Sequence, residues 1–114
     1  MTWTAFLDAT DGEAIASENL ALVAAYLKVD LGDDDTILIR CTKAAIGYVI
    51  AAVGSFPEGD PEAELLLFAI VEDLYENREL MQSDIQQRKR MEYTFGSMLL
   101  QLQLKYDTWE DESS

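Results

Sequence analysis

Apolar side chains recur every three or four positions through the first half of the chain, which is the spacing of one face of an α-helix. Thr10 and Glu13 have the spacing of a capping box, and Ser17 is a second candidate N-cap. The pattern predicts a first helix that begins between residues 11 and 18 and ends near Lys28. Its apolar face is formed by Leu20, Val23, Ala24 and Leu27.

A second helix is predicted from about Asp35 to Val53. Asp33, Asp34 and Asp35 stand at its start, where carboxylates can cap free N–H groups at the positive end of the helix dipole. Gly54 stands where helices commonly end in a left-handed glycine. The apolar stripe consists of Leu38, Cys41, Ala45, Tyr48, Val49 and Ala52.

The longest predicted helix is central and runs from Pro61 to Met81. Asp60 supplies an acidic N-cap, and Pro61 occupies the first helical position. The apolar run from Leu65 to Val71 has the length of a buried strand, but helix formers dominate and flank it. Because this run covers nearly the whole circumference of a helix, we expect burial by its own domain and by a neighbouring subunit.

The candidate subunit-interface residues on this helix are Leu67, Ile70, Leu74, Tyr75 and Arg78. Arg78 is surrounded by acids, and its guanidinium could form a forked pair with a carboxylate of its own subunit or of the next. An intrahelical pair one turn away is about equally favoured. Both interpretations of Arg78 stay open at this level.

The C-terminal third has a weaker pattern. A polar loop is predicted after Ser83, and it contains a basic cluster that is a candidate docking loop for a protein partner: Arg88, Lys89 and Arg90. Leucine and tyrosine alternate with polar residues from Leu100 to Tyr106, which is the period of a strand, although leucine, glutamine and lysine are helix formers. We expect a short helical turn over residues 95–99, then an extended stretch, then a frayed acidic end.

These elements predict a mainly α fold, a small helical bundle with a long central helix and a short extended or strand-like C-terminal segment. The expected organisation is an N-terminal arm over residues 1–12, a helical domain over 13–106 and an acidic tail over 107–114. The chain has 114 residues, which is enough for one domain with its own core and too few for two.

The composition excludes several classes of function. With 22 acids, 8 bases and a net charge of −14, binding to nucleic acid through phosphates is disfavoured. The chain contains no histidine and a single cysteine, Cys41, so a disulfide within the chain and most histidine-dependent catalysis are excluded. We expect a soluble intracellular protein that is not an enzyme, because we find no signal segment, apolar run of transmembrane length, phosphate loop or nucleophile–base pair.

The clustered acids do not fit a metal site or a catalytic pair well. In an EF-hand register that starts at Asp30, Asp35 falls where glycine is required and Cys41 where a bidentate glutamate is required. Carboxylates on successive turns of the central helix could share a raised pKa, but a solvated face is the simpler interpretation; these are Glu72, Asp73, Glu76 and Glu79. We expect no metal and no cofactor, and Cys41 as a small buried apolar residue.

Five segments in a fixed order resemble the head-tail connector (adaptor or head-completion) proteins of long-tailed bacteriophages. The resemblance covers roughly residues 18–106, with Leu74 and Thr94 at positions where that family often has other residues. The segments are Ala25-Tyr26-Leu27-Lys28-Val29-Asp30, Asp33-Asp34-Asp35, Ala44-Ala45 before Tyr48, Leu74-Tyr75-Glu76-Asn77-Arg78-Glu79, and Phe95-Gly96 followed by Leu99-Leu100-Gln101-Leu102.

The resemblance implies a virion protein at the head-tail joint, assembled in the host cytoplasm. It implies a homo-oligomeric ring, a dodecamer on the portal protein, with a downstream tail-joining or stopper protein as its other partner. DNA would pass through the channel without specific binding, and an acidic channel wall would repel it. The alternative hypothesis is an acidic DNA mimic or regulatory module that binds a protein.

Overall fold

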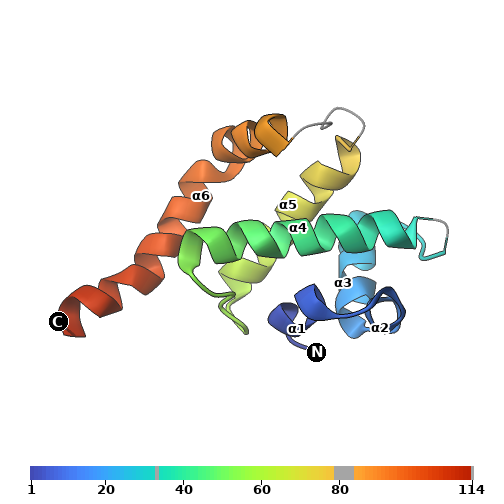
Figure 1. Ribbon diagram of the computed structural model, residues 1–114, viewed down its shortest axis with the longest axis horizontal. Coiled ribbons are helices and arrows are strands. Elements are labelled where there is room, and N and C mark those ends of the chain that lie inside the picture. The colour runs from blue at the N-terminus through green and yellow to red at the C-terminus, as the bar shows by residue number, and fades with distance from the viewer. Residues whose placement is uncertain (33, 79–83, 114) are drawn as a thin grey trace.

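The computed structural model describes the backbone of residues 1–32, 34–78 and 84–113, and the side chains of these ranges apart from 84 and 107–113. Every regular element in these ranges is a helix, which confirms the mainly α bundle (Figure 1). The helices are α1 (Trp3–Asp8), α2 (Asp11–Ile15), α3 (Glu18–Leu27), α4 (Asp35–Val53), α5 (Pro61–Glu76) and α6 (Asp84–Ser113).

Helix α4 is the centre of the described fold. It contacts α1, α2, α3, α5 and α6, and Figure 1 shows α5 crossing behind it while α6 begins above α4 and runs past its C-terminal end. Its length and mean hydropathy of 1.6 would also suit a membrane span, although no such span was expected from the sequence. In this fold its apolar side chains form the core instead: Leu38, Ile39, Cys41, Ala45, Ile46 and Val49 are buried.

The N-terminal arm, expected to be weakly patterned, is helical and contributes to the core. Thr2 caps α1 by accepting a hydrogen bond from the Ala5 N–H, and Trp3 and Phe6 are buried. The Trp3 ring centroid lies 6.1 Å from that of Phe6, 6.3 Å from Phe56 and 5.9 Å from Phe68. Tilted and edge-on ring pairs at this separation stabilise a core beyond the area they bury.

The predicted ends of the first helical region are confirmed, although the region contains two helices. Thr10 and Glu13 form a complete capping box at the start of α2, and the two hydrogen bonds from Thr10 lower the pKa of Glu13. Ser17 caps α3 by accepting from the Leu20 N–H. Lys28 ends α3 in the left-handed region, at φ 60°.

The start of α4 is only partly as predicted. Asp34 occupies the N-cap position but makes no capping hydrogen bond with its side chain, since its carboxylate accepts from the Tyr75 hydroxyl at 2.8 Å instead. The Asp35 carboxylate accepts from the Gly32 N–H at 2.7 Å, and Asp33 lies outside the described residues. The far end is confirmed, because Gly54 follows Val53 with φ 100°.

Helix α5 begins as predicted, with Asp60 as N-cap and Pro61 at the first position, but it ends at Glu76 and not at Met81. Asn77 leaves helical geometry at ψ 18°, and its side-chain amide donates to the Asp73 carbonyl oxygen at 2.9 Å. Residues 79–83, which include the predicted end, lie outside the described residues. Helix α5 is therefore shorter than α6, and the longest helix is not the central one.

The loop and the extended stretch predicted for the C-terminal third are wrong, because residues 84–113 form one helix, of which the predicted helical turn over residues 95–99 is a part. The alternation of apolar and polar residues misled the prediction for a physical reason. Leu102 faces the core at 4% exposure, whereas Leu100 and Leu104 are 52% and 58% exposed. The alternation thus combines one buried leucine with two exposed ones and does not mark a strand. The acidic end, which was expected to fray, continues α6 to Ser113.

We predict that Phe6→Ala lowers the free energy of unfolding by about 3–5 kcal/mol, since the ring is fully buried and its removal leaves a cavity. Urea denaturation of dilute protein measures this. The matched control is Tyr93→Ala, which removes an aromatic ring that is 94% exposed and should change stability by less than about 0.5 kcal/mol. Equal effects of the two substitutions would show that α1 does not belong to the core.

Candidate interaction surface

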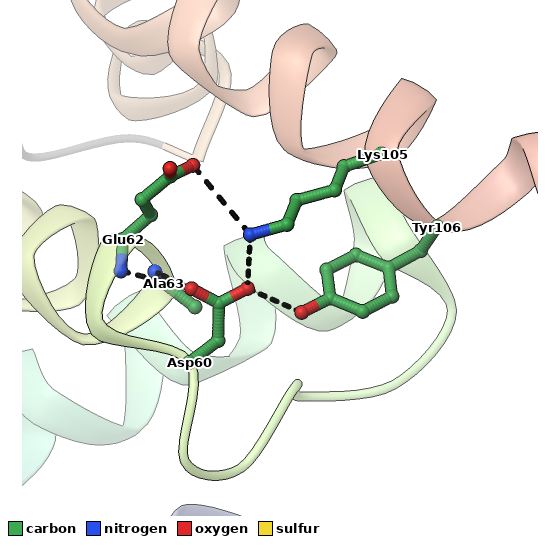
Figure 2. Close-up of polar contacts among 5 residues, drawn as sticks. All are labelled: Asp60, Glu62, Ala63, Lys105 and Tyr106. Atoms are coloured by element: carbon green, nitrogen blue, oxygen red, sulfur yellow. Dashed lines mark hydrogen bonds and ion pairs between the residues drawn. The ribbon is translucent and has the colours of Figure 1, made fainter.

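An aspartate at the start of α5 connects that helix to α6. One Asp60 carboxylate oxygen accepts from the N–H groups of Glu62 (2.9 Å) and Ala63 (3.5 Å), and so caps α5. The other accepts from the Lys105 ammonium at 2.8 Å and from the Tyr106 hydroxyl, both on α6 (Figure 2). Lys105 also lies 3.7 Å from the Glu62 carboxylate. A single carboxylate therefore both caps α5 and fixes the C-terminal half of α6.

The electrostatics of this contact favour the charged aspartate. The hydrogen bonds from Lys105 and then from Tyr106 lower the pKa of Asp60 from 3.8 to about 2. The same bonds raise the pKa values of Lys105 and Tyr106. The Asp60 side chain is only 7% exposed, whereas that of Lys105 is 46% exposed, so water screens the pair on one side.

A second ion pair fixes the N-terminal half of α6 to α5. The Arg90 guanidinium donates through Nε and Nη2 to the two Asp73 carboxylate oxygens, at 3.0 and 2.7 Å. This forked geometry has two parallel bonds, and it raises the pKa of Arg90. Asp73, interpreted from the sequence as part of a solvated acidic face, is 13% exposed in its side chain. With Asp60, it determines how α6 lies against α5.

Between α4 and α6 lies an open apolar groove of about 770 Å³. The α4 wall is built from small residues, among them Ala44, Gly47 and Ala51, and the α6 wall includes Gly96 and Leu100. A Cβ atom added at Gly47 or at Gly96 would meet no other atom within 4 Å. Helix α6 therefore covers this part of α4 incompletely.

A smaller hollow of about 240 Å³ adjoins this groove, because Ala44 lines both. Arg40 and Arg78 line the hollow, and Arg88 lines the groove. Three of the chain's four arginines thus lie around one end of the groove in a protein of net charge −14. We call these three residues the arginine rim.

The predicted interface residues on α5 divide into two groups. Leu67, Ile70 and Leu74 are buried in the chain's own core, so in this fold they are not accessible to a second subunit. Tyr75 and Arg78 lie at the C-terminal end of α5. The Arg78 guanidinium donates to the Tyr75 carbonyl oxygen at 2.5 Å and lies 4.5 Å from the centre of the Tyr75 ring, so it contacts both the backbone and the aromatic face of that residue.

The basic cluster lies on a helix and not in a loop, because Arg88, Lys89 and Arg90 belong to the first turns of α6. The three side chains are exposed at the residue level, but their environments differ. Arg90 is paired with Asp73, whereas Arg88 lines the groove. The sequence pattern identified the cluster but could not show that Arg90 is paired and Arg88 is not part of that pair, because the pairing depends on the contact between α6 and α5.

Cys41 is buried as expected, at 9% exposure, and lines the small hollow. Burial raises the pKa of its thiol, and the nearby Arg78 partly opposes that shift. In the described ranges, no three side chains of the metal-binding types lie close enough together to hold an ion.

Comparison with known proteins gives no match: no family model, no curated protein and no solved structure matches this chain.

We predict that Asp60→Asn lowers stability at neutral pH by about 1 kcal/mol, because asparagine can still cap α5 but no longer pairs with Lys105. The folded-state pKa of about 2 lies below the ordinary 3.8, so the contribution of the pair is present above pH 4 and is lost as pH falls towards 2. Urea midpoints between pH 7 and pH 2 measure it. Glu62→Gln is the control, and an identical pH dependence for wild type and Asp60→Asn would contradict the assignment.

We predict that Cys41→Ala costs about 1–2 kcal/mol as a small truncation in the core. The native thiol should react with a thiol reagent far more slowly than the unfolded chain, because it is buried and its pKa is raised. Labelling followed by mass spectrometry checks this, and labelling of native protein at the unfolded rate would place Cys41 at the surface.

Proposed function

We propose that this chain is a structural head-tail connector of a long-tailed bacteriophage, which forms a ring under the portal and joins capsid to tail. The observation that carries the proposal is apolar surface left open both on a helix and in a groove of the chain. One helix, α6, exposes large apolar side chains at Tyr93, Leu100 and Leu104, and the same chain has an open apolar groove between α4 and α6. Exposed apolar surface of this kind is typical of protein–protein contact sites.

The geometry suits head-to-tail assembly. The C-terminal end of α6 points away from the rest of the chain in Figure 1, and the arginine rim lies at the other end of the groove. A surface that binds a different surface of the next copy produces a closed ring when the rotation between copies closes. Ring closure needs subunits of fixed shape, and the two carboxylates that fix α6 to α5 would provide it.

The charge suits a channel. With 22 acids against 8 bases, a ring of these chains would repel a DNA duplex that moves through it, and so DNA would pass without specific binding. The portal and a downstream tail-joining protein are the proposed partners, the virion is the proposed location, and we assign no catalytic role. An acidic DNA mimic is less well supported, because it has no need of the exposed apolar groove.

We predict that the concentrated protein forms closed rings visible by negative-stain electron microscopy, with one dominant mass by light scattering. Double substitution Leu100→Ser and Leu104→Ser should reduce the ring fraction strongly while circular dichroism stays near wild type, because both side chains are more than half exposed. The control is Leu22→Ser on α3, which is 50% exposed and lies away from the groove. A protein that stays monomeric at all concentrations would contradict the proposal.

A further inference from the structure

Helix α6 is divided in charge along its length. Its first turns carry the basic cluster Arg88, Lys89 and Arg90, flanked by Asp84 and Glu92, whereas the charged residues of 107–112 are all acids: Asp107, Glu110, Asp111 and Glu112. The sequence places a single large aromatic residue, Trp109, among these acids. Tryptophan anchors are enriched in protein interfaces, where an acidic surrounding sets the choice of partner.

The acidic end of α6 extends past the Asp60 contact and away from the body of the chain (Figure 1). Asp60 holds Lys105 and Tyr106, and the helix continues for two further turns, to Ser113. These turns are thus presented as a helical projection from a fixed base. A projecting helix of preset direction loses little conformational freedom when it docks.

The groove between α4 and α6 has the properties that such a helix requires. Its α4 wall consists of small residues at Ala44, Gly47 and Ala51, which allow a third helix to approach closely. Gly47 and Gly96 face open space, so no side chain of the chain itself fills the groove there. One end of the groove carries the arginine rim, whose charge is opposite to that of residues 107–112.

We propose that the C-terminal end of α6 of one subunit docks in the α4/α6 groove of the next, with its acids against the arginine rim of that subunit. The occupant is a second copy of this chain. One observation selects it over another partner: the four acids of residues 107–112 are opposite in charge to the rim. The inference rests on the self-assembly proposed above and names the surfaces that perform it.

The test uses two classes of full-length variant. Gly47→Glu places an acid in the groove without a clash, since an added Cβ meets nothing within 4 Å. Asp111→Lys with Glu112→Lys brings the net charge of residues 107–112 from −4 to zero. Sedimentation velocity should show that each variant alone associates at least about tenfold more weakly than wild type. Gly12→Glu is the matched control, because Gly12 also faces open space, lies in α2 far from the groove, and should leave assembly unchanged.

Mixing the two disabled variants gives the decisive result. One variant retains an intact projecting end and the other an intact groove, so the mixture should form a 1:1 dimer and nothing larger. Wild-type assembly by all variants, or a mixture that stays monomeric, would overturn the docking.

The outcomes also distinguish the docking from the connector proposal. If the variants assemble into rings, the docking is wrong while the connector proposal stands. If the mixture dimerises but wild type forms open chains, the docking stands and the connector proposal fails. A monomeric wild type overturns both.

Discussion

The fold depends on the burial of α4, whose apolar stripe needs more cover than any one helix provides. Helices α1 to α3 cover one part of it and α5 crosses it, while α6 covers the remainder incompletely. The uncovered part is the groove lined by Ala44, Gly47 and Ala51. An apolar strip left open on a central helix is a strong reason for a chain to associate, because burial of that strip is favourable in any complex that covers it.

The position of α6 determines both the width of the groove and the direction of the projecting end. Two carboxylates on α5 set that position: Asp73 holds Arg90 near the start of α6, and Asp60 holds Lys105 and Tyr106 further along. Asp60 is unusual because it also caps α5. The start of one helix and the attachment of another thus share one group, which couples the direction of α6 to the integrity of α5.

Helix-capping and helix-ending residues predicted many of the helix ends from the sequence. The features that the sequence analysis missed depend on contacts between residues far apart in the chain. Thr10, Ser17, Pro61 and Gly54 act within four residues of their partners, and the helix ends that they mark are where the pattern placed them. The burial of Trp3 depends on Phe56 and Phe68, which no local pattern connects to it.

The same limit applies to the candidate surface. The basic cluster at Arg88 was recognisable from its charge, but its place on a helix and beside a groove required the packing of α6 on α4. The Asp60–Lys105 pair joins residues 45 positions apart, and the strand-like alternation around Leu102 concealed it. An apolar helix surface can be buried either in the chain's own core or against another subunit, and the sequence does not distinguish the two. Leu67, Ile70 and Leu74 were therefore interpreted as a subunit interface, but the chain's own core buries them.

The most direct test of this account is a disulfide cross-link between subunits. In a Cys41→Ala background, new cysteines at Gly47 and Ser113 place one thiol in the groove and one at the projecting end. Mild oxidation of assembled protein should give a ladder of covalent oligomers that ends at a single largest species, the closed ring. Chains with only one of the two cysteines should give no ladder. A protein that forms only intramolecular disulfides, or none, when both cysteines are present would contradict head-to-tail docking of α6.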